Sequence, residues 1–182
     1  MDKDRDKRLP TLSFEQVAQL AREILLQQGS HLPTLIVEGH NQMVVSHLTP
    51  LEDTHEGRAQ QMFSAGYVLA EANVIGVLKQ VFFVCEAWMS FATEGKMPTL
   101  PPSEDPSRKE VLMISNLKVQ EQTGKVAILE MLRNEAGDVT EIREFQEHLM
   151  ATHADSPLLT AFIHGFDAGM NTPVNGGFDA KL

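Results

Sequence analysis

The stretch Gln80–Ser90, QVFFVCEAWMS, decides which folds this chain can adopt. Its apolar residues occupy both alternating sets of positions: Val81, Phe83, Cys85, Ala87 and Met89 on one side, and Phe82, Val84 and Trp88 on the other. Successive side chains of a β-strand point to opposite faces of the sheet, and an apolar face must be covered. The sequence therefore predicts a central strand here, shielded on both sides by other parts of the chain.

Strand patterns flank this segment on both sides. Downstream, β-prone runs at Glu110–Leu117, Lys125–Asn134 and Val139–Phe145 are joined by short turns, which predicts a meander. Upstream, the runs Thr34–Glu38 and Gln42–Leu48 surround a Gly-His-Asn sequence typical of a hairpin. Short connections of this kind join antiparallel neighbours.

Three helices are expected around these strands. The first, about residues 14–28, follows a capping-box pattern in which Ser13 precedes Gln16, and its apolar residues recur at helical spacing. A second should run from about 55 to 76. A short third helix should begin at Pro157, since proline is favoured at the first helical position.

The resulting element order is α-β-β-α-β-β-β, with a further strand expected before a final α. This order predicts the α+β class: an antiparallel sheet of five or six strands with helices packed on it. Across residues 13–166, the order resembles that of the profilin-like and roadblock-like folds. Members of those folds often act as dimerisation or regulatory platforms, so the resemblance implies a role in protein interaction.

One domain is expected in the 182 residues. Residues 1–10 alternate acidic and basic side chains and should form a disordered N-terminal tail, and 11–168 should form the single α+β domain. Residues 169–182 are rich in Gly, Asn and Pro and should form a flexible C-terminal tail.

Charge and cysteine content narrow the expected partners and location. The formal net charge of -10 and the absence of a Lys/Arg stripe argue against nucleic acid as a partner. The single cysteine, Cys85, cannot form an internal disulfide and fits a reducing compartment. No apolar stretch of signal-peptide or membrane-helix length is present. We therefore expect a cytoplasmic protein that binds no membrane.

The usual catalytic signatures are absent from the sequence. There is no P-loop, dinucleotide glycine fingerprint, nucleophile elbow or H-E-x-x-H helix. The seven histidines do not show the spacing of metal ligands; His148 and His153, for example, are five apart and fall on different faces of a helix or strand. The sequence thus predicts neither a metal nor a cofactor.

Glu86 interrupts the apolar strand and shares a face with Trp88. A carboxylate there must be solvated, paired or protonated, because burying an isolated charge is costly. A strand end that emerges into solvent, or a neighbouring Arg or Lys that neutralises the charge, would explain it structurally. The functional hypothesis is a pocket between this strand and the proline-rich loop 98–110.

Two functions follow from these patterns. The leading prediction is a non-enzymatic interaction or regulatory domain, with a homodimer as one form, that binds itself or another protein through a sheet edge or the second helix. The alternative is a small-molecule-binding protein or enzyme, in which Glu86 serves as acid or base and Arg108 holds a small anionic ligand. The ligand-binding candidates are Glu86, Trp88, Asp105, Arg108 and Glu110.

Overall fold

The computed structural model describes residues 11–91, 99–145 and 156–171. Residues 1–10 and 172–182, which hold all of the expected N-terminal tail and most of the C-terminal one, lie outside the described residues, as do His148 and His153. Within the described residues, no helix is long and apolar enough to cross a membrane.

The part of the chain that the structure describes contains six strands, which form one antiparallel sheet in the order β2-β1-β3-β4-β5-β6. The α+β class and the element order are confirmed, with the larger of the two expected strand numbers. The strands are β1 (Thr34–Gly39), β2 (Met43–His47), β3 (Leu78–Met89), β4 (Lys109–Lys118), β5 (Thr123–Arg133) and β6 (Val139–Glu144).

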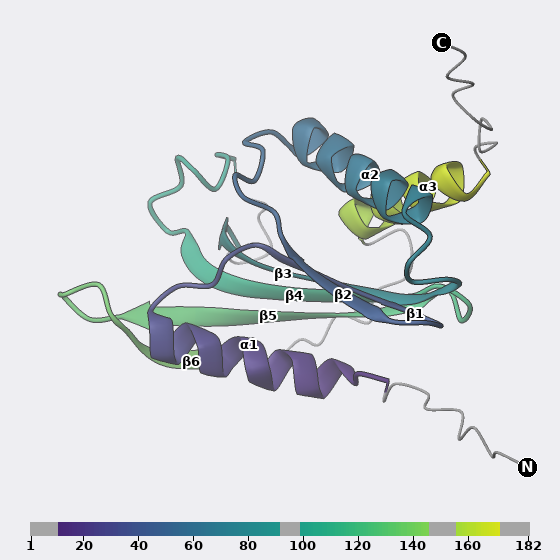
Figure 1. The fold of residues 1–182 in the computed structure, drawn as a ribbon. Helices are drawn as coiled ribbons and strands as arrows, with labels where there is room; N and C mark the ends of the chain where they lie inside the picture. Colours follow the sequence, from purple (N-terminus) through teal and green to yellow (C-terminus); the bar gives the residue numbers. More distant parts are fainter. Residues whose placement is uncertain (1–10, 92–98, 146–155, 172–182) are drawn as a thin grey trace, which may run out of the picture.

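Helices cover both faces of this sheet (Figure 1). They are α1 (Phe14–Gln28) on one face, and α2 (His55–Glu71) and α3 (Pro157–Met170) on the other. Strand β3 lies between β1 and β4, and its two faces contribute to two separate cores. Phe82 and Val84 pack with α1, whereas Phe83 and Cys85 pack with α2 and α3. The prediction of a central strand that is covered on both faces is confirmed.

Helix α1 has the predicted bounds because its two ends are capped as the sequence indicates. The hydroxyl of Ser13 accepts a hydrogen bond from the Gln16 amide at 3.1 Å, and the Gln16 side chain accepts one from the Ser13 amide at 2.8 Å. Gly29 ends the helix in the left-handed conformation, with φ 73°. Val17, Ala21 and Leu25 form the buried stripe.

Buried polar groups fix the segment that leads into α1. Glu38 on β1 and Gln80 on β3 are register partners, and the Gln80 amide donates to Glu38 Oε2 at 2.7 Å. The same Glu38 oxygen accepts from the Leu12 amide at 3.1 Å, and Gln80 also donates to the Leu12 carbonyl at 2.8 Å. The two side chains thus hold both backbone groups of Leu12 and position the start of the helix.

The predicted end of the second helix and the predicted start of the C-terminal tail are wrong. Helix α2 ends at Glu71 and not near residue 76, because Asn73 adopts φ 49°, a left-handed conformation that stops the helix. Helix α3 continues to Met170, so residues 169 and 170 belong to the domain and not to the tail. Gly169 is buried there, close to the backbone of Tyr67 on α2.

Candidate functional site

Glu86 is neutralised by an arginine that sequence reasoning missed. Its Oε2 lies 3.6 Å from Nη2 of Arg133, the last residue of β5, and its Oε1 accepts a hydrogen bond from the His31 backbone amide. The side chain of Glu86 is 25% exposed, so the carboxylate is neither free in solvent nor isolated in the core. The sequence left several explanations open for a carboxylate at this position. The observed contact agrees with the one in which a neighbouring Arg neutralises the charge.

Glu110, another candidate, binds the same arginine. Arg133 donates from Nε to Glu110 Oε2 at 2.7 Å and from Nη2 to Oε1 at 2.9 Å. Its Nη1 donates to the carbonyl oxygens of Gly29, at 2.8 Å, and Gly137, at 3.0 Å. Every nitrogen of the guanidinium is therefore engaged, so this cluster connects strands and offers no unused donor group to a ligand.

Trp88 and Arg108 form a second pair. The Arg108 guanidinium carbon lies 4.5 Å from the centroid of the Trp88 ring, within the range of a cation–π contact. Arg108 also donates from Nη1 to the Ser103 carbonyl. Trp88 is 49% exposed, so this pair covers a strand end at the surface.

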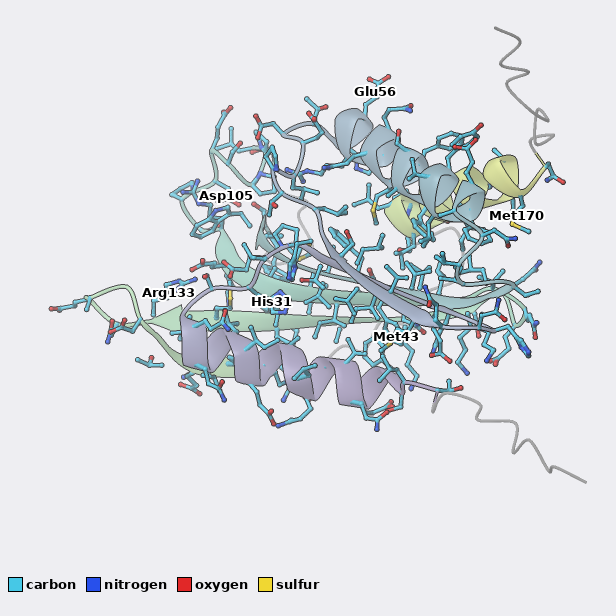
Figure 2. All side chains as sticks on the ribbon, in the orientation of Figure 1. His31, Met43, Glu56, Asp105, Arg133 and Met170 are labelled. Carbon is cyan, nitrogen blue, oxygen red and sulfur yellow. The ribbon has the colours of Figure 1, made fainter. Side chains whose placement is uncertain are left out.

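Asp105 stabilises the turn of the proline-rich loop. Its Oδ1 accepts hydrogen bonds from the Ser107 amide at 2.8 Å and the Ser107 hydroxyl at 2.6 Å, the pattern of an Asx turn. These bonds to Ser107 hold the pKa of Asp105 below its usual range. Figure 2 shows Asp105 and Arg133 toward the same end of the sheet.

The side-chain contacts of the five candidates form three arrangements, although Trp88 and Glu110 are register partners on β3 and β4 and the Arg108 amide donates to the Asp105 carbonyl at 3.2 Å. Glu86 and Glu110 share Arg133, Trp88 holds Arg108, and Asp105 bonds to its own loop. Two pockets among the described residues, of about 450 and 410 Å³, lie elsewhere on the sheet. A pocket between β3 and the loop, with Glu86 as acid or base, stays a prediction.

The outer edge of β2 carries features that the sequence did not single out. Strand β2 is the last strand on its side of the sheet and contains no Asp, Glu, Lys or Arg. Met43 and Val45 on this strand are 42% and 55% exposed. Apolar side chains on an unpaired edge strand favour contact with another chain.

An apolar groove lies beside this edge, between β2 and α2. Its volume is about 410 Å³, and it is lined by Val44 and Ser46 of β2 and by side chains of β1, α2 and α3. Val68 on α2 lines the groove and is 63% exposed. Successive side chains of a strand point to opposite faces of the sheet. Val44 and Ser46 therefore point to the face covered by α2, and Met43 and Val45 point to the opposite face.

The opposite edge of the sheet is charged. Strand β6 carries Glu141, Arg143 and Glu144; Arg143 binds Glu141 at 2.8 Å, and Glu144 pairs with Arg22 of α1. Charged side chains on an edge strand oppose pairing with another strand. The two edges of this sheet are thus chemically different.

The described residues offer neither a reactive thiol nor a metal-binding cluster. Burial raises the pKa of the Cys85 thiol to about 12, so the thiol is protonated and unreactive near neutral pH. Among residues 11–91, 99–145 and 156–171, no three His, Cys, Asp or Glu side chains are grouped closely enough to hold a metal ion.

Comparisons with protein-family models, characterised proteins and solved structures each return no match.

Proposed function

We propose that this domain acts as a homodimeric interaction module in which β2 of one copy pairs with β2 of a second. The observation that carries the proposal is the contrast between the two sheet edges, since β6 is charged and β2 exposes Met43 and Val45 without any charged neighbour in the strand. Proteins commonly block an edge strand with charged residues, and β2 contains none.

The lack of charge on β2 is compatible with a second copy as its partner. Two chains that each carry a net charge of -10 repel one another, and this repulsion is weakest where the contact surfaces lack acidic residues. The five residues of β2 meet that condition. Two identical antiparallel strands are also related by a two-fold axis, the commonest symmetry of soluble oligomers.

The groove supplies contact area that two short strands cannot. Specific interfaces bury roughly 1,200–2,000 Å² in total, more than a pair of five-residue strands provides. With the axis at Val45, Val44 of each copy stands opposite Ser46 of the other, and the exposed Val68 side chains flank the seam. The proposed interface therefore combines the strand pair with the α2 side of both grooves.

Sedimentation equilibrium of the 182-residue chain tests this proposal. We expect a dimer for the wild type and a monomer for Val45→Lys, because a lysine at the centre of the seam would face its own copy. The matched control is Thr140→Lys, which places the same charge on the exposed edge strand β6 and should leave the dimer intact. A monomeric wild type, or equal loss of the dimer in both variants, would contradict the proposal.

The role that this interaction supports is regulatory or structural and not catalytic, and we place it in the cytoplasm. Two observations support the non-catalytic role. The Cys85 thiol is unreactive, and Glu86 and Glu110 are both paired with Arg133.

A further inference from the structure

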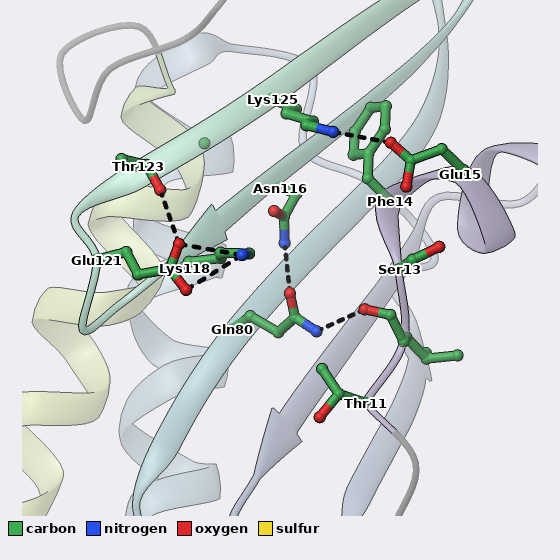
Figure 3. A pocket seen from close by; sticks show the side chains of 12 residues that line it. Thr11, Ser13, Phe14, Glu15, Gln80, Asn116, Lys118, Glu121, Thr123 and Lys125 are labelled. Carbon is green, nitrogen blue, oxygen red and sulfur yellow. Dashed lines mark hydrogen bonds and ion pairs between the residues drawn. The ribbon is translucent and has the colours of Figure 1, made fainter.

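A pocket lies where the chain enters α1, on the face of the sheet opposite α2 and α3 (Figure 3). Its volume is about 450 Å³, within the range of small-molecule sites. One wall is the segment Thr11–Glu15, and the other is the β4–β5 hairpin that contains Thr123 and Gly124. It is separate from β2 and from the proposed dimer seam.

Two buried amides form the polar floor of this pocket. Gln80 and Asn116 are each 3% exposed, and both line the pocket. Asn116 Nδ2 donates to the Gln80 side-chain oxygen at 3.3 Å and to the Val81 carbonyl at 3.2 Å. Figure 3 shows Asn116 between the two walls, with Gln80 connecting it to the Leu12 backbone.

The orientation of both amides is fixed by backbone carbonyls. The Leu12 carbonyl can only accept a hydrogen bond, so the Gln80 NH₂ group must face it, and the Gln80 oxygen then faces Asn116. The Val81 carbonyl fixes the Asn116 NH₂ group in the same way. Asn116 Oδ1 therefore remains as an acceptor to which no described residue donates, and a ligand here needs an N–H or O–H group.

The rim carries both signs of charge. Lys118 pairs with Glu121 at 3.0 Å and Lys125 with Glu15 at 2.8 Å, and all four side chains are about half exposed or more. Such surface pairs stabilise a protein by only about 0–1 kcal/mol, so a ligand can replace one partner at little cost. The Phe14 ring adds an apolar wall beside Lys125.

We propose that this pocket binds a small zwitterion with an apolar body, of the α-amino-acid class. The ligand ammonium donates to Asn116 Oδ1 and to a rim carboxylate, the ligand carboxylate binds Lys118, and the apolar body packs against Phe14. Equal numbers of Lys and Glu at the rim favour a zwitterion over a ligand with a net charge.

Isothermal titration calorimetry of the 182-residue chain with L-phenylalanine tests the proposal. The comparison ligands are 3-phenylpropionate, which lacks the ammonium group, and phenethylamine, which lacks the carboxylate. We expect saturable binding of L-phenylalanine and affinities at least about tenfold weaker for both analogues, since each loses one charged contact. Equal binding of either analogue, or no binding of L-phenylalanine and L-leucine at millimolar concentration, would overturn the proposal.

Two variants locate the site. Asn116→Ala removes the free acceptor and should abolish binding, with the fold checked by circular dichroism. Lys118→Met keeps the alkyl chain, leaves the buried network intact and should weaken binding about tenfold. Its matched control is Lys109→Met, an ion-paired lysine at the other end of β4, which should bind L-phenylalanine as the wild type does. Equal affinity of Lys118→Met and Lys109→Met would contradict the assignment of this pocket.

Discussion

Arg133 binds Glu110 through two parallel hydrogen bonds, from Nε to Oε2 at 2.7 Å and from Nη2 to Oε1 at 2.9 Å. The same guanidinium lies 3.6 Å from Glu86 and donates to the Gly29 carbonyl at the end of α1. One side chain therefore connects β3, β4 and β5 to the helix that covers them.

Replacing Arg133 should destabilise the fold. We expect Arg133→Met to lower the free energy of unfolding by about 2 kcal/mol, because it leaves the partly buried carboxylates of Glu86 and Glu110 without their cation. Urea unfolding followed by circular dichroism measures the change. Arg143→Met, which removes only an exposed pair with Glu141, should cost less than about 0.5 kcal/mol. Equal losses in the two variants would contradict this account.

The sequence predicts the elements of this fold well because their signals are local. The apolar pattern of β3 and the capping box at Ser13 each depend on residues that are only a few positions apart in the sequence. Both predictions are confirmed. The end of α2 was predicted about five residues too late, because it depends on the φ angle of Asn73. The apolar residues around Asn73 keep helical spacing and give no sign of that angle.

The candidate site was harder to predict because its contacts depend on strand register. Arg133 meets Glu110 and Glu86 from 23 and 47 residues away in the chain, and only the pairing of β3, β4 and β5 brings them together. Strand order likewise decides that β2 lies at an edge, since the hairpin pattern alone does not show which strand faces outward.

Stability should depend on pH through His31. Burial lowers the pKa of His31 below 6.5, although the Leu32 carbonyl and Glu86 oppose the shift. Between the folded and unfolded pKa values, only the unfolded chain binds a proton here, so the free energy of unfolding falls as the pH decreases from about 6.5. The loss is complete below the folded-state pKa.

The variant His31→Asn isolates this contribution. An asparagine amide can donate to the Leu32 carbonyl in place of Nδ1, and the backbone amide that binds Glu86 is retained. Urea unfolding between pH 8 and pH 5 should show a smaller decrease in the free energy of unfolding for the variant than for the wild type. The same decrease in both proteins would exclude His31 as the source.

Helices α2 and α3 should not tolerate a side chain at Gly165. A Cβ atom there would lie 1.9 Å from the Phe63 carbonyl oxygen, so the helices would have to separate. We expect Gly165→Ala to lower the free energy of unfolding by about 3 kcal/mol, although alanine is favoured over glycine by about 1 kcal/mol in an unhindered helix. Thermal unfolding measures the change. A stabilised variant would show that the helices are not in close contact.

Disulfide trapping should identify which sheet edge forms the proposed dimer. If two β2 strands pair around an axis at Val45, residue 45 of each copy faces its counterpart, and Val45→Cys should form a covalent dimer under mild oxidation. Cys85 should not compete, because it is buried and its thiol pKa is raised to about 12. Non-reducing gel electrophoresis at several protein concentrations measures the product. Thr140→Cys places an equivalent thiol on the charged β6 edge and should stay monomeric on the gel. Cross-linking of Thr140→Cys as fast as Val45→Cys would indicate random collision and would remove the basis for assigning the interface to β2.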